Sequence, residues 1–201
     1  MSVQFGTIYV ASQLEEAVIE LLQEWFPTYL RDLESELGLQ QGLLRPPLVY
    51  TTRNSFEGIP GDRMPICVVI SPGLNDEPFT REAGKYTARW NLGVGVGVAA
   101  NDEPTANKLS KIYGACVRGI MMQHQSINGN AIRVDWLDEN YDDLHEDQLQ
   151  YYKSAGVYFA VEVENVLDKR KGPATPDTDP YPPLPTVQTT IVDVGRLNGD
   201  E

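Results

Sequence analysis

The sequence of 201 residues contains only two cysteines and two histidines. Cys67 and Cys116 cannot form a disulfide framework or a zinc site on their own. Both lie in apolar stretches, so we expect small buried hydrophobic residues rather than nucleophiles. Neither His124 nor His145 belongs to a metal-binding or hydrolase motif, and no Walker loop occurs. No constellation of residues calls for enzymatic activity, and we predict no catalytic, cofactor or metal site.

Long apolar runs and clusters of basic residues are also missing. No run of about 18 apolar residues occurs, so no membrane span is expected, and no secretory signal is evident. We therefore expect a protein that stays in the cytoplasm in which it is made. The 29 acidic residues outnumber the 16 lysines and arginines, which gives a net charge of −13. This charge disfavours a nucleic-acid recognition surface, but it is compatible with an acidic passage through which DNA slides.

Two helices are predicted in the first two thirds of the chain. The first opens at Ser12, which has capping-box spacing to Glu15, and its apolar stripe runs from residue 14 to 37. Pro27 lies inside this stripe, so we expect a kink or two abutting helices. The second helix starts near residue 101, where Asp102 suits its positive end, and its apolar stripe runs from residue 109 to 121.

Five strands are expected at residues 48–52, 66–71, 86–98, 132–136 and 157–163, and the alternation is clearest in the third. The predicted fold class is α+β or α/β, with a single mixed, largely antiparallel sheet of four to five strands packed with two main helices. Gly93, Gly95 and Gly97 alternate with valines, so they lie on one face of a strand rather than in a dinucleotide-binding turn. We expect a close neighbour to pack against them, namely a helix on the sheet.

Two charged segments are predicted to be loops. The first covers residues 72–84 and carries Asp76, Glu77, Arg81 and Glu82, with Lys85 directly after it. The second, residues 135–147, packs seven acids and His145 into thirteen residues. It lacks the central glycine of a calcium-binding loop, so we interpret it as a solvated acidic loop that can also serve in an interface.

The composition changes from residue 169 onward, where six prolines fall between residues 173 and 185. This pattern excludes helix and central strand and indicates an extended arm. Residues 187–192 within it are β-prone. Two interpretations stay open: the arm adds as an edge strand to a neighbouring molecule, or it is a disordered tail. We therefore divide the chain into an α/β domain (residues 1–168) and a Pro-rich arm (residues 169–201).

Several blocks of the domain resemble the tail terminator proteins of long-tailed, siphovirus-type phages of actinobacteria. These blocks occur in order between about residues 10 and 168 and cover residues 14–30, 71–74, 90–96, 112–118 and 136–144. The resemblance implies a small α/β subunit of the virion neck, assembled in the host cytoplasm. Such a subunit forms a ring of six copies that stops polymerisation of the major tail protein and docks the connector or stopper protein of the head.

Three regions are predicted to make contacts in such an assembly. The loop at residues 76–85 would reach the tube or an adjacent subunit. The acidic run at residues 138–147 would face the lumen or a basic partner, and the arm would wrap onto a neighbour. The candidate interface residues are Asp76, Glu77, Arg81, Glu82, Lys85, Asp138, Glu139, Asp142, Asp143, Pro180, Tyr181, Pro182, Pro183, Ile191 and Val192.

Three alternatives to a terminator remain open at this point. The chain could be another phage neck component, such as a head-completion or stopper protein. It could be a metal- or nucleotide-handling enzyme, which tight and stoichiometric binding of calcium, zinc or nucleotide would indicate. It could also be a generic bacterial binding module, which would stay monomeric at every concentration.

Overall fold

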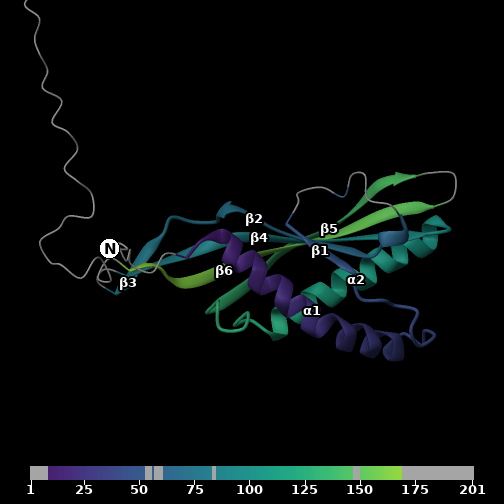
Figure 1. Ribbon diagram of the computed structural model, residues 1–201, viewed down its shortest axis with the longest axis horizontal. Helices are drawn as coiled ribbons and strands as arrows, with labels where there is room; N and C mark the ends of the chain where they lie inside the picture. Colours follow the sequence, from purple (N-terminus) through teal and green to yellow (C-terminus); the bar gives the residue numbers. More distant parts are fainter. Residues whose placement is uncertain (1–8, 53–55, 57–60, 83–84, 147–149, 169–201) are drawn as a thin grey trace, which may run out of the picture.

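The computed structural model describes residues 9–52, 56, 61–82, 85–146 and 150–168. Two long helices and a six-stranded sheet form the described part (Figure 1). The elements are, in chain order, α1 (Ala11–Glu36), β1 (Val49–Thr51), a short 3-10 turn (Gly61–Arg63), β2 (Ile66–Leu74), β3 (Phe79–Glu82), β4 (Lys85–Ala100), α2 (Glu103–Gln123), β5 (Arg133–Glu146) and β6 (Tyr151–Asp168).

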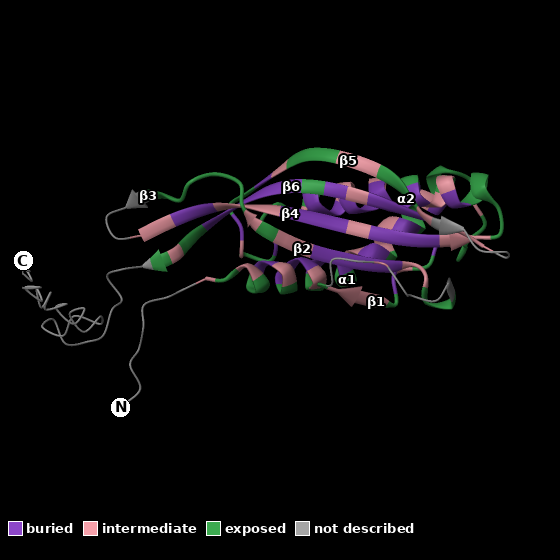
Figure 2. Ribbon diagram, turned by 90° about the horizontal axis from the view of Figure 1, so that it is seen from above, coloured by how far each residue is buried: buried purple, intermediate pink, exposed green. Residues whose placement is uncertain are grey.

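The sheet is mixed and open, with the strand order β1-β2-β4-β6-β5. β1 pairs in parallel with β2, whereas all other neighbours pair antiparallel, and β3 pairs with the first residues of β4. β1 and β5 therefore form the two opposite edges of the sheet (Figure 2). The predicted fold class is confirmed, and the sheet has one strand more than expected.

Both helices pack against the same face of the sheet, so the domain has two layers (Figure 1). Strand alternation decides which side chains they cover. Along β4, Val94, Val96 and Val98 enter the core with the apolar stripes of α1 and α2. Cys67 and Cys116 are buried in this core, as predicted, and burial raises the pKa of both thiols. The face away from the helices is called the open face below.

The start of α1 differs from the prediction. The helix begins at Ala11, and Gln13 Oε1 accepts a hydrogen bond from the Val10 N–H at 2.9 Å. Ser12 therefore lies inside the first turn. Glu15, the predicted capping partner, accepts a hydrogen bond from the Ser71 N–H of β2 at 2.6 Å. The capping-box prediction is wrong. The Glu15 carboxylate, which was expected to cap the helix, binds the N–H of Ser71 in the sheet instead.

One helix continues through Pro27, so two abutting helices are not formed. Pro27 cannot donate to the carbonyl of Gln23. Both residues are exposed, so water can satisfy that carbonyl. The start of α2 agrees with the prediction, since Asp102 Oδ1 accepts from the Thr105 N–H at 2.9 Å.

Two segments that were predicted as loops form strands. The segment after Pro72 contains the end of β2 and all of β3, and the acidic run forms β5. Both predictions relied on the density of charged and turn-forming residues. In β5, which is an edge strand, the side chains of Asp138, Asp142 and Asp143 reach solvent without leaving the sheet. High polarity therefore did not exclude a strand in this position.

Candidate assembly surfaces

The carboxylates of β5 are divided between the two faces of the sheet. Glu139 points toward the helices, where its Oε2 lies 2.5 Å from Arg118 Nη1 of α2 and its Oε1 accepts from the Tyr141 hydroxyl. Asp143 also lies on this side and accepts from Lys153 Nζ. Two of the four candidate acids of the run are thus used within the subunit, where they hold β5 against α2 and β6.

Asp138 and Asp142 have the opposite orientation. They pair in register with Tyr158 and Ser154 of β6, on the open face. Among the described residues, the Asp138 carboxylate accepts only from the Glu139 N–H, at 2.8 Å. Neither carboxylate forms an ion pair with any other residue that the structure describes. These two acids therefore leave negative charge on the open face.

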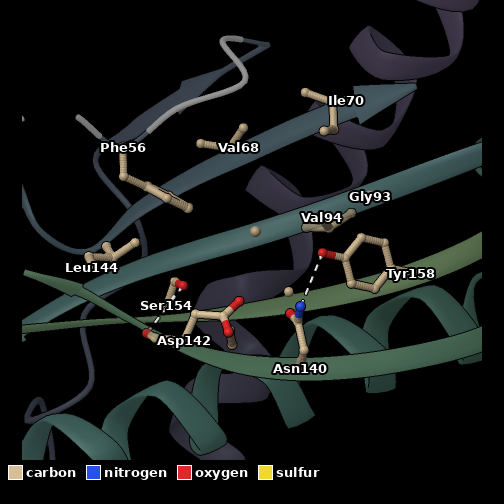
Figure 3. A pocket seen from close by; sticks show the side chains of 13 residues that line it. Phe56, Val68, Ile70, Gly93, Val94, Asn140, Asp142, Leu144, Ser154 and Tyr158 are labelled. Carbon is tan, nitrogen blue, oxygen red and sulfur yellow. Dashed lines mark hydrogen bonds between the residues drawn. The ribbon is translucent and has the colours of Figure 1, made fainter. Parts of the chain in front are cut away.

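A groove of about 240 Å³ lies on the open face next to Asp142 (Figure 3). Gly93, Gly95 and Gly156 form its floor. Phe56, Val68 and Ile70 line one side, whereas Asn140, Asp142 and Leu144 line the other (Figure 3).

The Phe56 ring is the group that packs close to the glycine strip. A Cβ on Gly95 would lie 3.0 Å from Phe56 Cζ, and one on Gly97 would lie 3.0 Å from Cδ1 of the same ring. The prediction of close packing is confirmed, but the prediction of a helix is wrong because both helices cover the other face.

The groove lining does not combine a nucleophile with a base. The Ser154 hydroxyl donates to the backbone oxygen of Asp142 at 3.5 Å rather than to a carboxylate, and Asn140 Nδ2 donates to the Tyr158 hydroxyl at 3.4 Å. Across the described ranges, no group of three metal-ligating side chains occurs. His124 stacks on Trp25 with ring centroids 4.1 Å apart, which places it in a packing role beside α1.

Exposed apolar side chains gather along the outer edge of β5. We call this set the β5 edge; it consists of Ile132, Trp136, Leu137 and Tyr141. Trp136 is 47% exposed, and the Arg118 guanidinium lies 4.9 Å from the centre of its ring. Leu137 is 50% exposed and sits at a shift in register between β5 and β6. Aromatic residues and arginine are enriched in protein interfaces, so the β5 edge has the composition of a contact surface.

A second group of exposed leucines lies in the segment between α1 and β1, and one of them, Leu48, adjoins the other edge of the sheet. The α1–β1 connection, residues 37–48, exposes Leu37, Leu43 and Leu48, and Leu48 directly precedes β1 with 78% of its surface exposed. Buried Glu34 shapes this connection, since its carboxylate accepts from the N–H groups of Gly42 at 3.0 Å and Leu44 at 2.6 Å. These hydrogen bonds hold the pKa of Glu34 below its usual value.

The predicted contact loop at residues 76–85 is part of a hairpin. Asp76 and Glu77 lie in the turn after β2, Arg81 and Glu82 belong to β3, and Lys85 opens β4. This β3 hairpin, residues 74–90, extends past the first turn of α1 (Figures 1 and 2).

The base of the β3 hairpin is connected to β5 by an arginine. Arg89 lies 3.4 Å from Asp76 Oδ2 and 2.6 Å from Asp135 Oδ2. Arg89 thus links Asp76 of the first charged segment to Asp135 of the second. The sequence analysis had predicted these two segments to be separate surfaces.

The candidate residues of the arm, which are Pro180, Tyr181, Pro182, Pro183, Ile191 and Val192, lie outside the described residues and remain predictions. No protein-family model matches the chain, and no curated protein is significantly similar to it. In the part of the chain that the structure describes, no helix is long and apolar enough to cross a membrane.

The sequence prediction missed the apolar component of the candidate surfaces. Leu137 and Tyr141 were assigned to an acidic loop, Trp136 to both that loop and the predicted strand at residues 132–136, and Leu48 to a strand. No alternation of polar and apolar residues marks the second half of β5 in the sequence. The bulge at Leu137 places Trp136 in register with buried Phe159, whereas Asp138 pairs with Tyr158 on the open face.

Proposed function

We propose that the chain is a non-enzymatic assembly subunit, namely a tail terminator of a long-tailed phage. Copies of it would form a ring of six that closes the tail tube and presents a docking face to the head connector. The observation that carries this proposal is the exposure of apolar side chains beside both opposite edges of one sheet. A ring of identical subunits needs two different contact surfaces on each copy, and these two edges supply them.

The remaining surfaces are assigned to the other partners of a terminator. The β3 hairpin projects from the body and exposes Leu74 and Phe79, which suits it to contact the major tail protein of the tube. Asp138 and Asp142 on the open face suit a lumen through which DNA passes without sequence recognition, since carboxylates repel phosphates. The proposed location is accordingly the neck of the virion.

Electron microscopy of the purified protein tests this function. We expect rings in solution, and we expect the protein to bind at one end of tail tubes assembled from the major tail protein of the same phage. Tube length should shorten as the ratio of terminator to tube protein rises. Rings that bind connectors but leave tube growth unchanged would indicate a stopper or head-completion protein, and a monomer at every concentration would indicate a binding module.

Deletion of residues 172–201 is expected to impair ring or neck assembly while the body stays folded. The physical reason is that the deleted arm contributes a β-prone segment, residues 187–192, which can extend a sheet of a neighbour. The measurement compares oligomer mass, phage yield and thermal melting of the truncated and full chains. Unchanged oligomer mass and phage yield would show that the arm has no role in assembly.

A further inference from the structure

We propose that the groove on the open face binds residues 180–185 of the arm of a neighbouring copy. This segment, called the proline hexad below, has the sequence Pro-Tyr-Pro-Pro-Leu-Pro. The docking site rests on the assembly function proposed above, and it gives the arm of one copy a place on the body of the next.

The floor of the groove offers no backbone partner to an occupant. Gly93 and Gly95 of β4 pair with β2 on one side and with β6 on the other, and Gly156 of β6 pairs with both β4 and β5. An added strand would therefore find no free N–H or C=O groups there, in contrast to a sheet edge. Proline has no backbone N–H that could be left unpaired, so a proline-rich segment loses little by lying on this floor.

Two aromatic rings stand along the glycine strip (Figure 3). A Cβ on Gly93 would lie 3.5 Å from Tyr158 Cε1, and a Cβ on Gly95 would lie 3.0 Å from Phe56 Cζ. Tyr158 is 39% exposed and Phe56 is half-buried, so both rings keep surface for an occupant. Grooves lined by aromatic rings bind polyproline II segments, whose extended conformation is already formed before binding.

The polar groups of the groove suit a chain that has acceptors and few donors. The carbonyls of a polyproline II helix form no internal hydrogen bonds, so they need donors from the surface that binds them. Asn140 Nδ2 donates to the Tyr158 hydroxyl oxygen at 3.4 Å, and among the described residues the hydrogen of this hydroxyl has no acceptor. The Tyr158 O–H is thus available to a carbonyl of the occupant.

The groove also has the length of one P-x-x-P unit. Its lining on β6 runs from Ser154 to Tyr158, which spans about 13 Å at the usual rise of a strand. A polyproline II helix rises about 3.1 Å per residue, so about four residues fill this distance. The proline hexad contains two P-x-x-P units, residues 180–183 and 182–185. With three residues per turn, the two prolines of each unit lie on one side of the helix.

A neighbouring copy supplies the hexad because the arm starts far from the groove of its own copy. The arm follows Asp168, ten residues beyond Tyr158 and about 33 Å farther along β6. Pro180 lies twelve residues after Asp168, which is about 37 Å in a straight polyproline II chain. The hexad would reach its own groove only if the chain reversed directly after Asp168 and stayed almost straight. The arm of a neighbour is under no such limit.

A fluorescein-labelled peptide of residues 178–187 tests the groove. The receptor is the full chain with a serine hexad, so that its own arms do not compete; it carries Pro180→Ser, Tyr181→Ser, Pro182→Ser, Pro183→Ser, Leu184→Ser and Pro185→Ser. We expect saturable binding by fluorescence anisotropy. In this receptor Tyr158→Phe removes the donor and keeps the ring, which should weaken binding about 3- to 10-fold. Tyr158→Ala also removes the ring and should weaken binding about 30-fold or more.

Tyr141→Ala is the matched control. Tyr141 is 40% exposed, close to the 39% of Tyr158, but it lies on the side of the sheet that faces α2. This variant should bind the peptide like the unchanged receptor, and a peptide with alanine at its four prolines should not bind. Equal affinity of Tyr158→Ala and Tyr141→Ala, or equal binding of the alanine peptide, would overturn the assignment. Circular dichroism melts verify folding, and Tyr158→Phe carries the test if Tyr158→Ala unfolds.

A photo-crosslinker identifies the copy that supplies the hexad. Tyr181→benzoylphenylalanine in the full chain is illuminated in a mixture of unlabelled and isotope-labelled copies. We expect covalent dimers and larger species on a denaturing gel, with links from position 181 of one copy to residues near Tyr158 of another. Links that stay within one copy would show that the arm occupies its own groove, which overturns the assignment to a neighbour.

Failure of this docking site and failure of the proposed function give different results. If the wild type forms rings but the peptide does not bind, the groove is not the docking site, whereas the ring function stands. If the wild type is monomeric at every concentration and no links form between copies, both the ring function and the docking of a neighbour's arm are wrong.

Discussion

Substitution of Gly114 by leucine is expected to destabilise the domain by about 3 kcal/mol, the upper part of the usual range for overpacking. For a chain of this length that corresponds to a fall in Tm of roughly 6–12 °C. Gly114 is buried in the middle of α2, at the point where the helix approaches β5 and β6. A Cβ there would lie 3.2 Å from Ala155 Cβ, 3.2 Å from Glu139 Oε1 and 3.3 Å from Tyr141 Cε1. The further carbons of leucine have no space unless α2 moves away from the sheet.

Gly119 provides the matched control within the same helix. A Cβ at Gly119 would meet only the ring of Tyr29, at 3.3 Å and 3.4 Å, and this ring is partly exposed and able to shift. We expect Gly119→Leu to change Tm by less than about 3 °C, since removal of a helical glycine offsets part of the crowding. Thermal melts by circular dichroism compare the two variants. Equal Tm values would show that α2 does not approach the sheet closely at Gly114.

The elements of the fold that local pattern alone determines were predictable. The buried face of α2 follows from its apolar spacing, and its start follows from Asp102, whose side chain caps the helix as expected. The alternation of β4 likewise predicted a strand with Gly93, Gly95 and Gly97 on one face, and this is what the structure shows. These features depend on interactions within one element or on a single buried face, so a short window of sequence contains the information.

Features that depend on distant segments were not predictable in the same way. Glu15 has the spacing of a capping residue, but the structure uses it for the Ser71 N–H, 56 positions away in the chain. The glycine strip indicated close packing, but no local pattern specifies that the ring of Phe56 is the group that packs there. Tertiary contacts thus override local preference at both places.

The candidate surfaces were also predictable only in part, because composition identifies residue types but not the face of the sheet on which each side chain lies. Composition identified the acids of β5 as interface candidates, but it treated all of them alike. Strand alternation separates them, so that Glu139 is bound by Arg118 whereas Asp138 and Asp142 remain on the open face. The exposed apolar residues Trp136, Leu137 and Tyr141 were overlooked as interface candidates because acidic residues dominate the same segment. An acidic stretch that also contains exposed aromatic residues is therefore better read as an edge strand than as a solvated loop.

Substitution of Glu34 by glutamine is expected to destabilise the domain at neutral pH and to weaken ring formation with it. The buried carboxylate accepts from the N–H groups of Gly42 and Leu44 at 3.0 Å and 2.6 Å. A glutamine retains one acceptor oxygen but turns an NH₂ group toward the second N–H, so one buried donor loses its partner. Leu43 lies between the two held residues, and its side chain is 55% exposed in the α1–β1 connection. Release of this connection removes the ordered surface that the next subunit is proposed to bind.

The pH dependence of stability distinguishes this role from a general loss of packing. Because folding lowers the pKa of Glu34, the unfolded chain binds the proton more tightly. The contribution of Glu34 is therefore complete above the ordinary pKa of a glutamate side chain and is lost as the pH falls through the lower folded value. The Tm difference between wild type and Glu34→Gln should be largest at neutral pH. It should shrink when the pH falls below the ordinary pKa of a glutamate side chain. Glu36→Gln, at the exposed end of the same helix, should melt like the wild type at both pH values. A difference for Glu34→Gln that persists undiminished into acid would mean that the charge of Glu34 does not hold the connection in place.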